Sequence, residues 1–190
     1  MSKSNRMTSS IINLRMFHNW VKNEMYRDVA KKLKDDGVND IHILELAVGR
    51  GGDLYKWIGI SAKEVVGIDI DKKSIFGKNG AVHRYNKMKK RAKFDKSIKL
   101  PRCYFHVIDL SQKDSIEKVK NAVRGNKFNL ISCQFAIHYF FKSKETFNTI
   151  STIISNHIDT GGYFMGSTLD GEKDRKSTRL NSSHQIISYA

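Results

Sequence analysis

Three stretches of the chain carry groups that could hold a nucleotide. An apolar run leads into Gly49, Gly51 and Gly52, and glycine lets a backbone turn sharply and approach a ligand closely. A second run ends at Asp69, twenty residues after Gly49, where a carboxylate can accept hydrogen bonds from both hydroxyls of a ribose. A third ends at Asp109, whose carboxylate can accept from an adenine amino group. Together, in this order, they favour S-adenosylmethionine.

The glycine turn does not match the fingerprint of a nicotinamide dinucleotide. The third glycine of that fingerprint would fall at Leu54, so the spacing disfavours NAD and NADP. Taken alone, the turn could be a plain connection between a strand and a helix. In the same way Asp69 could be a solvated carboxylate, and the nearby Asp71 is interpreted as one.

These groups need a scaffold in which the ends of several strands meet. Short apolar runs alternate with longer helical stretches, which predicts βαβ units and a parallel sheet with its ligand-binding edge at the carboxyl ends of the strands. The predicted strands cover residues 41–46, 65–70, 103–108, 130–135 and 163–166. The predicted helices cover residues 12–34, 73–91, 114–123 and 144–158, with a further helix after the glycine turn. The first helix would face the core with Leu14, Phe17, Val21, Met25 and Val29.

Composition narrows the class of protein. A length of 190 residues with one proline and no linker fits one domain. The formal net charge of +15 suits a polyanion such as RNA, or an anionic membrane surface. Cys103 and Cys133 are too few for a zinc site or a disulfide framework, so both are interpreted as reduced core residues of an intracellular protein. No secretory signal and no apolar run near the ~20 residues of a membrane span is visible, and no metal is expected.

Four blocks of sequence resemble the mRNA cap guanine-N7 methyltransferases. Residues 17–22 (FHNWVK) are similar to the family's F-N-N-W-x-K, and residues 44–57 to L-D-L-G-C-G-K-G-G-D-L-x-K-W. Residues 67–75 with Arg84 and Tyr85 form the third block, and residues 132–141 (SCQFAIHYFF) are similar to S-C-Q-F-x-x-H-Y-x-F, the most specific of the four. Residues 161–168 also resemble G-G-x-F-I-G-T-T, so the resemblance spans most of the stretch from 14 to 168.

The resemblance implies a fold and a reaction. The fold is the class I S-adenosylmethionine-dependent methyltransferase (Rossmann-like) α/β fold, with a mostly parallel sheet, helices on both faces and its last strands missing. The reaction transfers a methyl group from S-adenosylmethionine to guanine N7 of the 5′ mRNA cap. Guanine N7 has a free lone pair at neutral pH, so we expect no chemical catalyst among the side chains. Proximity and orientation would supply the rate, with His138 and Tyr139 as orienting residues.

The resemblance also assigns residues to the two ligands. Lys22 would pair with the methionine carboxylate of the cofactor, and Asp53 would lie near its ammonium group. The remaining cofactor-binding residues would be Ala47, Gly49, Asp69, Asp109, Gln134 and Tyr139. The cap guanosine and its triphosphate would be bound by His18, Asn19, Arg50, Lys56, Arg84 and His138. Lys22, Lys56 and Arg84 could instead be solvated helix charges, and Arg50 could merely cap the turn. His138 could be a hydrogen-bonded core residue. Trp57, Phe135 and Phe140 are interpreted as core.

Two positions depart from the family pattern. His18 replaces the first Asn of the first block, so one cap contact would differ. Ala47 replaces the first Gly of the turn, and it would still allow backbone contact with the cofactor if its φ is negative. The variant turn over residues 48–52 favours a source among the large DNA viruses.

The last seventeen residues, DRKSTRLNSSHQIISYA, resemble the translation of a short-read sequencing adapter. We therefore expect residues 1–173 to be the methyltransferase domain, incomplete at its C-terminus, and residues 174–190 to be an artefact. The cap-binding residues that lie later in the family's sequences would then be absent. We expect low stability and little or no activity from this chain.

Expected partners are the capped 5′ end of mRNA and other capping-enzyme domains, with no membrane. The expected compartment is the nucleus for a cellular source, or the host cytoplasm or virion for a viral one. Two alternatives stay open. One is another class I RNA methyltransferase, which competition by a cap dinucleotide would separate. The other is a non-catalytic RNA-binding module on the same fold, which would bind the cofactor without transferring a methyl group.

Overall fold

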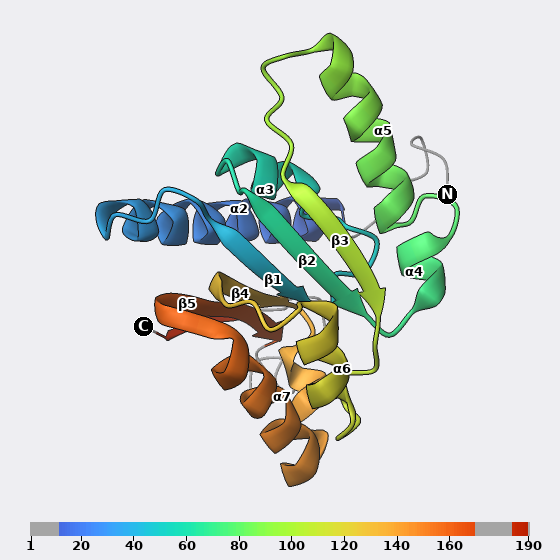
Figure 1. The fold of residues 1–190 in the computed structure, drawn as a ribbon, viewed down its shortest axis with the longest axis vertical. Coiled ribbons are helices and arrows are strands. Elements are labelled where there is room, and N and C mark those ends of the chain that lie inside the picture. The colour runs from blue at the N-terminus through green and yellow to red at the C-terminus, as the bar shows by residue number, and fades with distance from the viewer. Residues whose placement is uncertain (1–11, 170–183, 190) are drawn as a thin grey trace.

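The computed structural model describes residues 12–169 and 184–189 of the chain. Their centre is one twisted sheet with the strand order β3-β2-β1-β4-β5-β6 (Figure 1). The first five strands run parallel, and β6 pairs antiparallel with β5. The strands are β1 (His42–Leu46), β2 (Glu64–Asp69), β3 (Arg102–Val107), β4 (Phe128–Gln134), β5 (Ile158–Leu169) and β6 (His184–Tyr189).

One helix precedes β1, and the others lie between successive parallel strands, as expected for βαβ units. They are α2 (Ile12–Asp35), α3 (Leu54–Gly59), α4 (Lys72–Phe76), α5 (Ala81–Phe94), α6 (Ser115–Ala122) and α7 (Lys144–His157). A 3₁₀ helix, η1 (Ile137–Lys142), lies between β4 and α7. Because all crossovers return to the same end of the sheet, β1, β2, β3 and β4 present their carboxyl ends along one edge.

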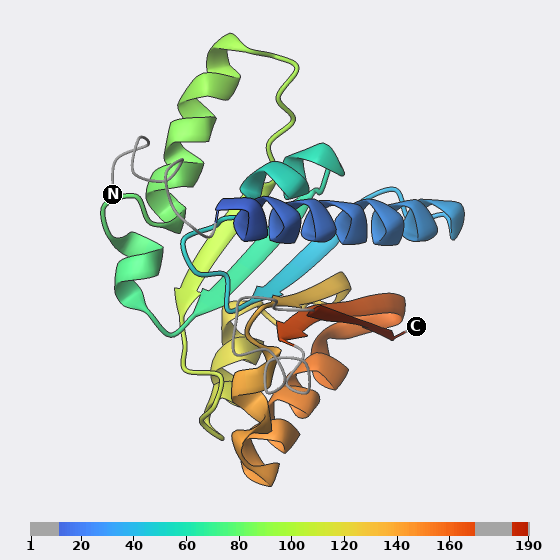
Figure 2. The ribbon, with the colours of Figure 1, turned by 180° about the vertical axis from the view of Figure 1, so that it is seen from behind.

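The sheet separates two apolar layers. On one face α2, α3, α4 and α5 pack on side chains such as Ile43, Val65 and Leu130. Figure 2 shows α2 lying across this face. On the other face α6, α7 and η1 pack on side chains such as Leu44 and Ile131. Neighbouring residues of β1 thus point to opposite layers, and both layers exclude water, as the near-continuous apolar runs predict.

The five predicted parallel strands are confirmed to within a few residues, and two helices differ from expectation. The helix predicted over residues 73–91 is two helices, since the chain breaks between Gly77 and Gly80. In α2, Val21, Met25 and Val29 are buried as expected, but Leu14 is only half-buried and Phe17 is 48% exposed. The first turns of α2 contribute no buried residue to the described core, which begins on this helix at Val21.

The expectation that the sheet stops at its fifth strand needs one correction. The backbone of β6 pairs along the outer edge of β5, with Phe164 opposite Tyr189 and Leu169 opposite His184. An open strand edge offers unpaired N–H and C=O groups to any extended segment, whatever its side chains. β6 lies inside the stretch predicted to be an adapter artefact; residues 174–183 and 190 of that stretch lie outside the described residues.

No helix in the described part of the chain is long and apolar enough to cross a membrane.

Candidate functional site

The glycine turn follows β1 in the chain and is hydrogen-bonded to the end of β2. Gly49 and Gly51 adopt φ values of 55° and 66°, which glycine reaches without steric cost. The amide of Gly49 donates to the Asp69 carboxylate at 2.7 Å, and the other oxygen of that carboxylate accepts from the Asp71 amide at 2.8 Å. These two contacts fix Asp69 at the tip of β2. Asp71 itself is exposed and caps α4 by accepting from the Lys73 amide.

A cavity of about 560 Å³ opens at this edge of the sheet. Five of the residues assigned to the cofactor line it: Ala47, Asp69, Asp109, Gln134 and Tyr139. They come from the ends of β1, β2, β3 and β4 and from η1, so the topology brings together side chains that are far apart in sequence. The cavity holds two carboxylates and an amide among apolar walls, a pattern typical of a nucleoside site.

Asp109 lies in a tight turn after β3. Its carboxylate accepts from the Ser111 amide at 3.0 Å and the Ser111 hydroxyl at 2.7 Å. Partial burial alone would raise the pKa of Asp109, but the Ser111 and Gln112 hydrogen bonds outweigh it and hold the pKa below its ordinary value. The carboxylate is therefore ionised at neutral pH and can accept a further hydrogen bond. The sequence did not predict Ser111, although a serine two residues after a strand-end Asp signals such a turn.

Beside the cavity, Asp53 lies between two lysines. The Lys22 Nζ is 2.7 Å and the Lys56 Nζ 2.8 Å from its Oδ1, and all three side chains are largely buried. The Lys56 Nζ also donates to the Asn19 Oδ1 at 3.2 Å. The solvated-charge alternative is thus wrong for Lys22 and Lys56. The Lys22 Nζ lies 5.8 Å from the centre of the Phe135 ring, which lines the cavity, so cluster and cavity adjoin.

Two residues of the cavity wall adopt a left-handed backbone without being glycine. Ala47 has φ 57°, so the condition of a negative φ, under which backbone contact with the cofactor was expected, is not met. A left-handed backbone at this position explains why glycine suits it. Phe135 also has φ 57°, is half-buried rather than core, and stacks on His18 with ring centres 4.6 Å apart. Trp57 and Phe140 are core residues as predicted.

The residues assigned to the cap do not lie in one place. His18, Asn19, Lys56 and His138 lie around Phe135, the Asp53 cluster and η1, and the His138 ring is 4.2 Å from that of Tyr139. Within the described residues, the His138 Nδ1 is buried with no hydrogen-bond partner. Arg84 instead lines a separate groove behind Gly51 and Gly52, where its Nε donates to the Asn79 carbonyl. Arg50 is exposed on the turn and lines neither space.

A buried polar network supports the site from inside the sheet. Glu45 on β1 accepts from the hydroxyls of Tyr26 and Ser132, and Trp57 donates to the Tyr26 hydroxyl at 3.2 Å. Ser132 in turn accepts from the Gln134 amide at 3.2 Å. Burial, and then the charge of Asp53, raises the pKa of Glu45 to about 8, so this carboxyl holds its proton at neutral pH. An acid inside an apolar strand was the signal for this network, which the sequence prediction missed.

The described residues hold no group of three His, Cys, Asp or Glu side chains that could bind a metal ion. Both cysteines are free, and Cys133 is buried while Cys103 is half-buried. Burial raises the pKa of Cys103 to about 12 and that of Cys133 still further, so neither forms a thiolate at neutral pH.

Comparison with known proteins adds to this geometry. Residues 1–186 match the family model described as the mRNA (guanine-N(7))-methyltransferase domain. A Caenorhabditis elegans mRNA cap guanine-N(7) methyltransferase is 33% identical over 171 residues, covering 88% of this chain and 42% of that protein. A probable mRNA-capping enzyme of Acanthamoeba polyphaga mimivirus is 30% identical over 93% of this chain and 16% of its own length. The chain therefore spans less than half of these relatives.

Solved structures agree on the fold alone. An S-adenosylmethionine-dependent methyltransferase from Clostridium acetobutylicum superposes with a TM-score of 0.54 at 16% identity, covering 76% of this chain and 49% of that one. The plantazolicin methyltransferase BpumL, solved with SAH, gives 0.56 at 13% identity, covering 92% of this chain and 57% of that one. The Rossmann-like α/β fold class predicted from the sequence is confirmed.

Proposed function

Because this chain belongs to the mRNA (guanine-N(7))-methyltransferase domain family, we propose that it transfers a methyl group from S-adenosylmethionine to guanine N7 of the 5′ mRNA cap, converting GpppN to m7GpppN. One observation carries the proposal. The cavity lined by Asp69 and Asp109 adjoins the buried Lys22–Asp53 pair, so a nucleoside site lies next to a site for a zwitterion.

The residues present fit S-adenosylmethionine group by group. The Asp69 carboxylate would accept from the ribose hydroxyls and the Asp109 carboxylate from the adenine amino group. Lys22 would bind the carboxylate of the amino-acid end and Asp53 its ammonium group, exchanging their mutual contact for these two. The Gly49 amide orients Asp69, the Ala47 backbone forms the floor of the turn, and Gln134 and Tyr139 close the cavity.

Orientation is the chemical task left to the protein. When bound, S-adenosylmethionine supplies a methyl group that is already activated by its sulfonium. Guanine N7 needs no deprotonation, so no side chain has to act as a base. His138, whose Nδ1 is buried and unpartnered among the described residues, would donate to or accept from the guanine beside Tyr139. Asn19 and Lys56 would extend this face, and His18, Arg50 and Arg84 would meet the triphosphate.

The test begins with calorimetry of S-adenosylmethionine on residues 1–190. We expect the unsubstituted chain to bind S-adenosylmethionine. Asp69→Asn removes a charged acceptor and should lower this affinity by about 10- to 100-fold. The matched control is Asp71→Asn, which alters an exposed acid two residues away and keeps the cap of α4. Absence of binding by the natural chain, or equal loss in both variants, would contradict the proposal.

The second part follows a labelled methyl group onto GpppG-capped RNA under single-turnover conditions, with any longer native protein that contains these residues measured beside this chain. Label recovered as 7-methylguanosine, with competition by the GpppG dinucleotide, supports the cap reaction. Label on another base favours a different RNA methyltransferase, and cofactor binding with no transfer by the longer protein favours the non-catalytic module.

The remaining parts of the proposal concern partners and place. The mimivirus relative is named a capping enzyme and is much longer than this chain, which supports association with other capping-enzyme domains. We propose the nucleus as the compartment for a cellular source, and the host cytoplasm or virion for a viral one.

A further inference from the structure

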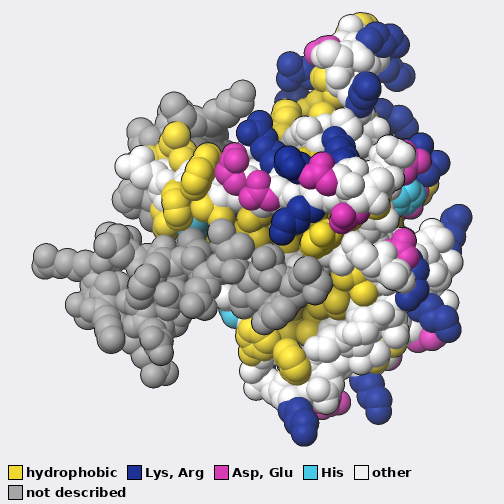
Figure 3. Space-filling model, turned by 90° about the vertical axis from the view of Figure 1, so that its left-hand side faces the viewer, with side chains coloured by type: hydrophobic (Ala, Val, Ile, Leu, Met, Phe, Trp, Pro, Cys, Tyr) yellow, Lys and Arg dark blue, Asp and Glu magenta, His cyan; other side chains and the backbone are white. Residues whose placement is uncertain are grey.

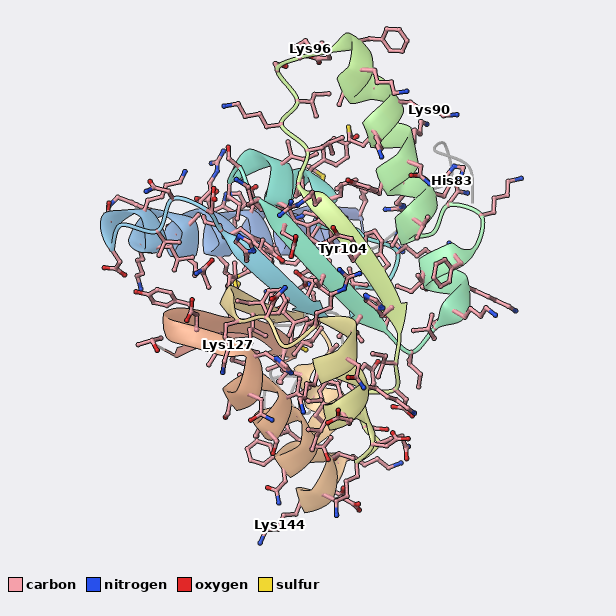
Figure 4. All side chains as sticks on the ribbon, viewed as in Figure 1. His83, Lys90, Lys96, Tyr104, Lys127 and Lys144 are labelled. Carbon is pink, nitrogen blue, oxygen red and sulfur yellow. The ribbon has the colours of Figure 1, made fainter. Side chains whose placement is uncertain are left out.

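The positive charge of the chain is concentrated on and around α5. Residues 72–99 hold eleven Lys and Arg and a single acid, Asp95, so this stretch supplies +10 of the formal net charge of +15. Figure 3 shows Lys and Arg side chains gathered over the upper part of the molecule, to which α5 rises in Figure 1. Figure 4 places Lys90 and Lys96 at this end, far from Lys127 and Lys144.

One side of α5 forms a groove with α3 and the glycine turn. This groove, which we call the α5 groove, encloses about 570 Å³ and shares no wall residue with the cofactor cavity. Arg84, Lys87 and Arg91 follow each other at helical spacing along one wall, and Tyr55 of α3, 66% exposed, lies on the other. Gly51 and Gly52 form the end nearest the proposed reaction site.

The charges in the α5 groove are available to a ligand. No carboxylate lines it. Lys87 and Arg91 are exposed, and neither forms an ion pair with any residue in the described ranges. A concave surface that carries these two exposed cations and has no carboxylate in its lining attracts a polyanion and focuses its field there.

We propose that the α5 groove binds the RNA chain that follows the cap, with Lys87 and Arg91 on successive phosphates and Tyr55 stacked on a base. The direction of the strand rests on the proposed function, because it assumes that the capped end lies on the far side of Gly51 and Gly52. Single-stranded RNA suits a cationic groove with an exposed aromatic ring, since every base offers a face to stack on.

The structure favours RNA over an anionic membrane. A helix that lies on a membrane needs a free apolar face, whereas Ala81 and Met88 of α5 are buried in the core of this protein. The cations that remain line a hollow, which a flat lipid surface would not fill.

The experiment measures binding of a GpppG-capped, 3′-labelled RNA of about twenty nucleotides, long enough to exceed one site of roughly 4–16 nucleotides. The natural chain is compared with Lys87→Gln/Arg91→Gln. We expect about tenfold weaker RNA binding and a salt dependence smaller by about 1.4 in the slope of log K against log salt, or ~0.7 for each phosphate contact. Affinities for S-adenosylmethionine and for the GpppG dinucleotide should not change.

The matched control is Lys127→Gln/Lys144→Gln, which removes the same charge from exposed positions away from α5. Equal weakening by both double variants would show only a net-charge effect and would overturn the proposal. Tyr55→Ala is a neutral second test: we expect weaker binding of single-stranded RNA and no change for a duplex, and unchanged binding of both would remove the stacking role.

Two further outcomes separate this inference from others. Binding to phosphatidylserine vesicles that is lost in Lys87→Gln/Arg91→Gln, with RNA binding unaffected, would replace RNA by a membrane as the partner. If the natural chain binds no S-adenosylmethionine but its RNA affinity still depends on Lys87 and Arg91, the proposed function fails and the RNA surface stands.

Discussion

Asp53 binds two lysines at once, and this arrangement sets how the cofactor would be recognised. Lys22 and Lys56 both lie within 3 Å of the same carboxylate oxygen. A ligand with both a carboxylate and an ammonium group can pair the first with Lys22 and the second with Asp53. No buried charge is then left unpaired. Under the proposed function, the pair would therefore favour a zwitterion over a simple anion.

Lys22→Gln should weaken binding of S-adenosylmethionine by about 10- to 100-fold, because it removes one charged hydrogen bond. Adenosine lacks the amino-acid end, so its affinity should not change. Calorimetry with both ligands makes the comparison, with Lys34→Gln on the exposed side of α2 as the control. Equal losses for adenosine and for S-adenosylmethionine would show that the variant damages the cavity instead.

The left-handed backbone of Ala47 leads to a prediction about stability. This conformation costs an L-residue about 1–2 kcal/mol, while glycine adds about 0.5–1 kcal/mol of unfolded-chain entropy. Ala47→Gly should therefore raise the free energy of unfolding by about 0.5–1 kcal/mol. Ala92→Gly within α5 should lower it by a similar amount. Urea denaturation distinguishes the two, and a destabilised Ala47→Gly variant would argue against strain at the turn.

The sequence predicted some of these residues and not others for a physical reason. Asp69 and Asp109 follow apolar strands, and the order of strands in a parallel sheet places such ends together. The pairing of Asp53 with Lys22 depends on where α2 crosses the sheet, which local patterns do not encode. The protonated state of Glu45 depends in the same way on its burial in the folded protein and on the nearby charge of Asp53.

At the scale of elements, the buried network joins α2 to the sheet. Tyr26 of α2 contacts Glu45 of β1 and Ser132 of β4, and Ser167 of β5 donates to Gln134 at 2.8 Å. One helix and three strands are thus linked by buried side chains. The network positions Gln134, the amide on the cavity wall.

The raised pKa of Glu45 makes stability depend on pH. Below about 4.5 its carboxyl is neutral in both the folded and the unfolded protein. Between there and about 8 the unfolded chain releases the proton while the folded chain keeps it, so the free energy of unfolding falls as pH rises. Glu45→Gln lacks this ionisation and should lose less stability across the window. Denaturation at both ends of the window tests this, with the exposed Glu117→Gln as the control.

The sequence predicted the helices and strands that have long apolar patterns. It missed an element whose start is set by an unusual backbone conformation. The strands and α7 follow directly from periodicity, and α7 begins with a capping box between Ser143 and Thr146. The 3₁₀ helix η1 was missed because its residues read as a continuation of the apolar β4 strand. The left-handed turn at Phe135 ends that strand, and an aromatic residue gives no sequence signal for such a conformation.

At the scale of the whole molecule, the outer edge of β5 is covered by the β6 backbone. A chain ending at Lys173 would open this edge but leave β1, β2, β3 and β4, which carry most of the cofactor cavity. We expect its affinity for S-adenosylmethionine to stay within about twofold, a change below ~0.5 kcal/mol, and its self-association to increase. Calorimetry and sedimentation measure the two effects. Loss of binding would make residues 174–190 part of the functional domain, against the proposal that they are a sequencing artefact.

The two apolar layers are not equally visible to fluorescence. The chain has two tryptophans, Trp57 buried among α2 and α3 and Trp20 exposed on α2, and the layer under α6 and α7 contains neither. Intrinsic emission would therefore record the loosening of one face and stay silent while the other melted. An emission curve that lagged behind circular dichroism would reveal that the α6–α7 side comes apart first.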